Sequence, residues 1–89
     1  MTRKLFYEDQ YIKEFEANVI SCAKKGDIFC VTLDKTAFFP EGGGQPGDTG
    51  SIGEARVIDT KEEEGEVIHL TDKPVFGKVF CALDFDKDL

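Results

Sequence analysis

Short apolar runs alternate with clusters of turn-forming residues along this chain. The run Phe15–Ala23 is rich in β-compatible side chains and ends at the polar, glycine-containing stretch Lys25–Asp27. A second apolar run, Ile28–Leu33, follows immediately. Two such runs joined by a glycine-containing turn are typical of a β-hairpin. We therefore expect an antiparallel pair of strands in the first third of the chain.

Further apolar runs follow over residues 55–60, 65–70 and 78–85. Strands that recur at intervals of roughly 10 to 20 residues are typical of a small barrel or sandwich. The acidic cluster Glu62–Gly65 indicates a solvent-exposed hairpin tip. Only Glu8–Glu14 could form a turn or two of helix, and this stretch is too short to be a stable helix alone. The pattern predicts an all-β fold in a single domain.

Length and composition agree with one globular domain. The chain has 89 residues, of which 40% are hydrophobic and 33% charged, enough for one modest core. No apolar run approaches the roughly 20 residues of a membrane-spanning helix. The opening Met1–Glu8 lacks the apolar stretch of a signal peptide. These features predict a cytoplasmic protein with no membrane partner.

The balance of charge limits the partners that the chain can bind by itself. Its formal net charge is -7, from 18 acidic and 11 basic residues. Neutralisation of phosphates by Lys and Arg supplies most non-specific affinity for nucleic acid. A protein that acts on RNA through this domain would therefore need a basic surface from another part of its chain.

No catalytic or metal-ligating set can be assembled from the residues that usually carry such chemistry. Cys22, Cys30 and Cys81 lie in apolar stretches and match neither a disulfide framework nor a zinc motif. His69 is the only histidine and lies in a strand-like run, where a packed or surface position is the usual one. We expect the cysteines to fill the core, and we assign no catalytic residue, metal ligand or cofactor to this chain.

The stretch Thr36–Gly50, TAFFPEGGGQPGDTG, has five glycines in its last nine positions and imitates two nucleotide-binding motifs. Gly42, Gly44 and Gly47 satisfy G-x-G-x-x-G, but that motif must open a helix, and the residues that follow are hostile to helix. The same stretch approaches a P-loop, except that Asp48 stands where the lysine should be and would repel phosphate. We therefore expect no direct nucleotide binding.

Two interpretations of the glycines remain open from the residues alone. In the first, Gln45–Asp48 forms a turn and the glycines let the chain cross a barrel seam. In the second, Gly42–Gly44 exposes bare backbone groups to which another domain or a substrate can approach closely. Phe38 and Phe39 would anchor the strand that precedes the glycines.

The stretch Thr36–Gly50 resembles the glycine-rich signature of the alanyl-tRNA editing protein (AlaX) family and of the editing region of alanyl-tRNA synthetase. The opening Lys4–Asp9, the run Phe15–Ala17 and the later Val57–Asp59 and Gly65–His69 resemble the amino-terminal module of the same family. The resemblance implies a small β-barrel of about six strands, similar to the second domain of translation elongation factors. It also implies that this barrel is an accessory domain of a zinc-dependent hydrolase that removes serine or glycine from the alanine tRNA.

The resemblance implies a pocket-wall role for the loop. Gly42, Gly43, Gly44 and Gln45 would narrow the editing pocket of a following domain and help to sense the serine hydroxyl. Glu41 and Asp48 would organise the loop through backbone N–H bonds. The residues assigned to this wall are Thr36, Phe39, Pro40, Glu41, Gly42, Gly43, Gly44, Gln45, Gly47, Asp48 and Gly50.

The family's zinc ligands, a His-x-x-x-His pair and a later Cys-x-x-x-His pair, have no counterpart in this sequence. The resemblance therefore implies that zinc and catalysis belong to a domain after Leu89, which would be the main partner of the barrel, and that the full-length protein binds tRNA(Ala). Because Met1 precedes the module's opening residues, we expect a free-standing editor; the editing region of an alanyl-tRNA synthetase is the alternative. An independent barrel that docks to a protein or RNA partner is a hypothesis of another class.

Overall fold

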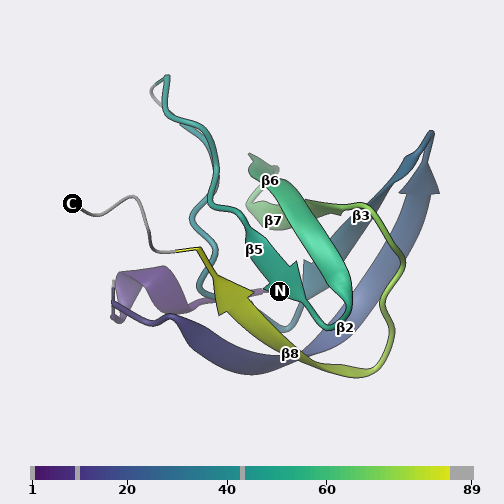
Figure 1. Ribbon diagram of the computed structural model, residues 1–89. Coiled ribbons are helices and arrows are strands. Elements are labelled where there is room, and N and C mark those ends of the chain that lie inside the picture. Colours follow the sequence, from purple (N-terminus) through teal and green to yellow (C-terminus); the bar gives the residue numbers. More distant parts are fainter. Residues whose placement is uncertain (1, 10, 43, 85–89) are drawn as a thin grey trace.

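The structure is a computed structural model that describes residues 2–9, 11–42 and 44–84 (Figure 1). Strands dominate these residues, and the only helix among them is one turn of 3-10 helix. The elements are β1 (Arg3–Lys4), η1 (Leu5–Tyr7), β2 (Glu14–Lys25), β3 (Ile28–Leu33), β4 (Lys35–Thr36), β5 (Gly50–Ile52), β6 (Ala55–Glu63), β7 (Glu66–Thr71) and β8 (Lys78–Leu83). The fold is all-β, as the sequence pattern predicts.

Six of these strands form a closed antiparallel barrel in the order β2-β3-β7-β6-β5-β8, in which β8 pairs with β2. The first two strands form the predicted hairpin, which turns at Gly26 with a φ of +66°. The hairpin of β6 and β7 turns at Glu64 and Gly65, both in the left-handed region, and its tip is exposed as predicted. Outside the barrel, β1 pairs in parallel with β4.

Two long strands close the barrel because each one pairs with different neighbours along its length. Strand β2 pairs with β8 over Glu14–Asn18 and with β3 from Val19 onward, with a register shift between Val19 and Ser21. Strand β6 pairs with β5 and then with β7, with a shift between Val57 and Asp59. Such irregularities bend a strand and increase its twist, which is what a small barrel requires.

Alternate residues of the strands point inward and form one core. Its largest members with almost no exposure include Phe38, Leu33 and Ile52. Cys81 is fully buried, and burial raises the pKa of its thiol to about 12. Cys22 and Cys30 are partly buried, and all three cysteines are free thiols. The core role predicted for the cysteines is therefore confirmed for Cys81 and holds only in part for the other two.

Two local predictions are wrong, and one strand was missed. The helical turn lies at Leu5–Tyr7, whereas none of the described residues of 8–14 is helical. The three-residue strand β5 was not predicted, because Gly50 and Ser51 give no apolar run. Phe38 is buried as an anchor, but the side chain of Phe39 is 50% exposed.

None of the described residues forms a helix long and apolar enough to cross a membrane.

Candidate functional site

The glycine-rich loop connects β4 to β5 and extends away from the barrel as two adjacent arms (Figure 1). Two hydrogen bonds between Phe39 and Asp48 join the arms. The N–H of Asp48 donates to the carbonyl of Phe39 at 2.9 Å, and the N–H of Phe39 donates to Oδ2 of Asp48 at 3.0 Å. The predicted organising role of Asp48 is confirmed by this contact. Asp48, the residue that breaks the P-loop pattern, thus holds the two arms of the loop together.

A buried hydrogen-bond chain fixes the first arm to the barrel. Oγ1 of Thr36 lies 2.7 Å from Nε2 of His69, and Nδ1 of His69 lies 2.8 Å from the carbonyl oxygen of Val31. Because that carbonyl can only accept, Nδ1 carries the proton, and the neutral ring accepts at Nε2 from the Thr36 hydroxyl. The hydroxyl oxygen accepts in turn from the N–H of Phe38 at 3.0 Å. The Thr36 hydroxyl and both ring nitrogens of His69 therefore all have hydrogen-bond partners.

His69 is held in its neutral form by this environment. Its side chain has no exposed surface, and burial lowers its pKa to about 4, outweighing the hydrogen bond with Val31, which acts in the opposite direction. The edge of the ring also packs against Phe38, with ring centroids 5.3 Å apart. His69 is therefore a packed residue that positions the base of the loop, as the usual role of a strand histidine suggests.

Strand β6 supports both arms of the loop. The N–H of Glu41 donates to the carbonyl of Thr60 at 2.8 Å, and the N–H of Gly47 donates to Oδ1 of Asp59 at 3.0 Å. The hydroxyl of Thr60 donates to the carbonyl of Asp48 at 2.8 Å. Glu41 thus joins the barrel through its own backbone N–H, while its side chain is exposed.

Two glycines of the second arm are required by close packing against backbone. A Cβ placed on Gly47 would lie 2.1 Å from the carbonyl oxygen of Thr60. A Cβ placed on Gly50 would lie 2.1 Å from the carbonyl oxygen of Ala82 and 2.9 Å from the Phe38 ring. No side chain fits at such distances, so the barrel itself accounts for these two glycines. They fit the interpretation in which glycines let the chain pass close to a barrel strand.

The exposed end of the loop, Gly42–Pro46, is built differently, and we call it the tip. Gly42 and Gln45 exchange two backbone hydrogen bonds of 3.1 and 2.9 Å, so the chain reverses here and not over Gln45–Asp48, as the first of the two interpretations had it. A Cβ on Gly42 or Gly44 would contact nothing within 4 Å. Gly44 needs its φ of +84° for the reversal, whereas no such constraint applies to Gly42. Gly43 lies outside the described residues.

The backbone of Gly42 is not bare, which corrects the prediction for this residue. Its N–H and its carbonyl are both engaged with Gln45. Because Gly42 has no side chain, a neighbouring group outside the barrel can approach its backbone closely.

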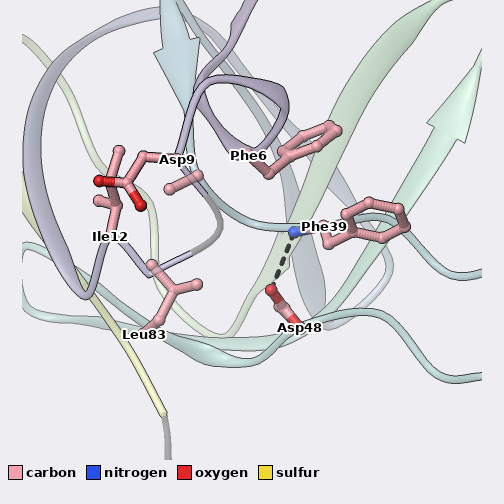
Figure 2. Close-up of a pocket in the computed structure, with 7 residues that line it drawn as sticks. Phe6, Asp9, Ile12, Phe39, Asp48 and Leu83 are labelled. Carbon is pink, nitrogen blue, oxygen red and sulfur yellow. Dashed lines mark hydrogen bonds between the residues drawn. The ribbon is translucent and has the colours of Figure 1, made fainter.

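A small pocket lies between the first arm of the loop and the segment around η1 (Figure 2). Its volume is about 140 Å³. The rings of Phe6 and Phe39 stand side by side on its rim, with centroids 4.8 Å apart, and Leu83 at the end of β8 forms part of its wall (Figure 2). The residues that line it are Phe6, Asp9, Ile12, Ala37, Phe39, Asp48 and Leu83.

The structure separates the residues that the sequence groups into one pocket wall. Thr36, Pro40, Gly47 and Gly50 are buried in the base and arms of the loop. Glu41, Gly42, Gly44 and Gln45 are exposed at or beside the tip, and Phe39 and Asp48 belong to the pocket. Phe6, Ile12 and Leu83 were missed as site residues. Phe6 lies in the opening segment that carries the family resemblance, but no pattern in the sequence brings Leu83 beside it.

The described residues do not fit a zinc site. They contain no group of three or more His, Cys, Asp or Glu side chains that could hold a metal ion. Both ring nitrogens of His69 are engaged within the core. No metal-binding role is therefore assigned to these residues.

A comparison with known families identifies the family of this chain. The family described as tRNA synthetases class II (A) matches residues 3–79, which include the base of the loop, the tip and most of the barrel. The chain belongs to this family. Its relatives carry the two names that the sequence resemblance indicated, so that the resemblance is confirmed.

Two relatives within this family illustrate the match. Alanyl-tRNA editing protein AlaX-M of Pyrococcus horikoshii is 45% identical over 91 residues, covering 97% of this chain and 40% of the relative. Alanine-tRNA ligase of Ignicoccus hospitalis is 45% identical over 80 residues, covering 85% of this chain and 8% of the relative. The chain thus spans well under half the length of these relatives. Their names support an editing-related domain.

Proposed function

We propose that this chain is the amino-terminal barrel of an alanyl-tRNA editing hydrolase, and that its tip borders the editing pocket of a zinc-dependent domain that follows in the longer protein. The substrate would be serine or glycine esterified to tRNA(Ala). The protein would act in the cytoplasm, and the tRNA would be bound by the full-length protein. The barrel would shape the site without supplying a catalytic residue.

One observation carries the proposal. Gly47 and Gly50 are explained by contacts within the barrel, but nothing within the described residues explains the glycine at position 42. Its Cβ position is open and its φ lies outside the left-handed region. Glycine costs conformational entropy, so its use in this exposed position supports close contact with something outside the barrel.

The geometry favours a steric role for the tip. The N–H and carbonyl of Gly42 already pair with Gln45, so this residue cannot donate to or accept from a serine hydroxyl without losing those bonds. A glycine surface would instead help to set the width of the pocket, where one methylene group more or less changes binding by about 1–3 kcal/mol. Gly43 and Gly44 would complete this surface.

The test uses AlaX-M of P. horikoshii in which this chain replaces the matched segment, a protein that we call the graft. Gly42→Val should lower kcat/KM for release of serine from Ser-tRNA(Ala) by about 10-fold or more, because the added side chain would intrude into the pocket. Glu54→Val, in the exposed turn between β5 and β6, is the matched control and should leave kcat/KM unchanged. Both variants should keep the unfolding temperature of the graft.

A Gly42→Val graft with unaltered kinetics would exclude the pocket-wall role. The 89-residue chain alone should neither deacylate Ser-tRNA(Ala) nor take up zinc. Ester hydrolysis by the isolated chain would show that the chemistry has been assigned to the wrong domain.

A further inference from the structure

The pocket beside the loop combines exposed aromatic rings with carboxylates. Phe6 packs on Tyr7 and on Phe39, with ring centroids 4.7 and 4.8 Å apart. Phe39 is nevertheless 50% exposed and Tyr7 73% exposed. A cluster of exposed rings around a pocket is more than the scattered apolar exposure of an ordinary surface.

Two acidic residues face this pocket. Asp9 and Asp48 both line it, Asp9 beside Ile12 and Asp48 bonded to the N–H of Phe39 (Figure 2). Asp9 accepts a hydrogen bond from the N–H of Tyr11 at 2.9 Å, and Asp48 accepts one from the N–H of Phe39 at 3.0 Å, among its contacts. Among the described residues that line the pocket, none is basic. A cation placed here would lie near two aromatic rings and two carboxylates, the two features that favour binding of a positive group.

The chain leaves the barrel beside this pocket. Leu83, the last residue of β8, lines it. Asp84 is then held on the barrel, since its N–H donates to the carbonyl of Thr49 at 3.0 Å and its carboxylate pairs with Arg56. Any sequence that continues after β8 therefore starts next to the pocket and next to the loop that carries the tip.

We propose that this pocket receives an arginine or lysine side chain from the domain that follows the barrel, and that this contact sets the position of the tip over that domain. The inference rests on the proposed function, because it takes the following domain as the occupant. The aliphatic part of the side chain lies against Phe6, Ile12 and Leu83, and its charged end lies by Asp9 and Asp48 near the Phe39 ring. Long basic side chains bury an apolar stem and keep a charged head outside in this way.

The size of the pocket agrees with one side chain and no more. Its 140 Å³ is close to the roughly 150 Å³ of an apolar cavity that takes up one benzene molecule. The acidic balance of the whole chain, -7, favours a basic occupant on the long-range scale as well. A second copy of this chain would bring like charge to the same surface.

The test compares the same substitution in the isolated chain and in the graft. Phe39→Ala should lower the unfolding temperature of the graft by about 5 °C more than that of the 89-residue chain, because it also removes an interdomain contact. Phe80→Ala is the matched control, since Phe80 is 53% exposed on β8 and lines none of the pockets around the loop. It should have the same effect in both proteins. Equal shifts for Phe39→Ala in the two proteins would overturn the proposal.

The charge of the occupant is tested separately. Asp9→Lys removes the hydrogen bond from the Tyr11 N–H in both proteins, and it should lower the unfolding temperature of the graft by more than that of the isolated chain. Asp27→Lys, in the exposed turn between β2 and β3, should have the same effect in both proteins. An occupant that is neutral or acidic would give no additional loss in the graft, or a gain, for Asp9→Lys. Either result would exclude a basic side chain.

The isolated chain gives an answer that does not depend on folding of the graft. N-acetyl-arginine amide, titrated into the ¹⁵N-labelled 89-residue chain, should shift the amide signals of Phe39 and Asp48 and leave that of Phe80 in place. N-acetyl-glutamate amide should shift none of them. Equal responses to the two probes, or no response at Phe39 and Asp48, would overturn the proposal. None of these readouts uses deacylation, so the pocket can fail while the function of the tip stands.

Discussion

The buried glycines of the second arm and the exposed Gly42 of the tip are glycine for opposite reasons. At Gly47 and Gly50 a Cβ would lie 2.1 Å from a backbone oxygen, so the barrel excludes every side chain. At Gly42 a Cβ would contact nothing within 4 Å. The fold therefore excludes a side chain at Gly47 and Gly50, whereas it sets no steric limit at Gly42.

The largest effect is expected at the base. Gly50→Ala places a methyl group against the carbonyl oxygen of Ala82 and the ring of Phe38. Neither can move without displacing a strand or the core, so we expect a loss of about 4 kcal/mol in the free energy of unfolding, or failure to fold. Urea denaturation followed by circular dichroism measures it. A folded Gly50→Ala chain within about 1 kcal/mol of the parent would show that the base is not constrained as described.

The next effect is a dependence of stability on pH that comes from His69. Its pKa is lowered from 6.5 to about 4 in the folded chain, so between these values the unfolded state binds a proton that the folded state does not. Stability should therefore fall as the pH drops from 6.5 to 4, by about 3 kcal/mol for this group, and no further below.

Two measurements separate this effect from the carboxylates that titrate nearby. His69 is the only histidine, so one imidazole proton signal follows it by NMR and should show no titration between pH 7 and 5. His69→Gln should remove its part of the pH dependence in a denaturation series. Titration of the folded imidazole near its ordinary value would contradict the buried hydrogen-bond chain.

Removal of the Thr36 hydroxyl should have a smaller effect on the free energy of unfolding. Thr36→Val keeps the shape of the side chain but leaves Nε2 of His69 and the N–H of Phe38 without their buried partner. We expect a loss of about 2 kcal/mol in the free energy of unfolding, because a buried polar group without a partner is costly. Thr32→Val, on the outer side of β3 beside Ser21, is the matched control and should change stability by less than about 0.5 kcal/mol.

The smallest effects are expected at the tip, where they should differ in sign. Gly44→Ala forces a side chain into the left-handed region, with φ at +84°, and should cost about 1 kcal/mol. Gly42→Ala meets neither strain nor contact and should raise the free energy of unfolding by about 0.5 kcal/mol, because it restricts the unfolded chain. The same denaturation experiment compares the two. A clear loss for Gly42→Ala would mean that the barrel, and not a partner, requires this glycine.

Much of the fold could be predicted because it depends on local periodicity. The runs that became β2, β3, β6, β7 and β8 carry their strand signal in five or more consecutive residues, and the turns between the hairpin strands carry glycine. Strand β5 gave no such signal, because its three residues are defined by pairing with β6 and β8. The helical turn at Leu5–Tyr7 was likewise misplaced, since one turn has too few residues for a period to be recognised.

By itself, the sequence determined the all-β class, the absence of a helix after the glycines and the family, because these depend on residue order alone. Only the tertiary structure decided which glycines serve the barrel and which do not, since that depends on the distance from each one to strands remote in sequence. It also decided that Asp48 bonds to Phe39 within the loop and that Leu83 meets Phe6 at a pocket. Leu83 and Phe6 are far apart in the chain, and Phe39 and Asp48 lie nine positions apart with no periodic pattern between them, so no local pattern encodes either distance.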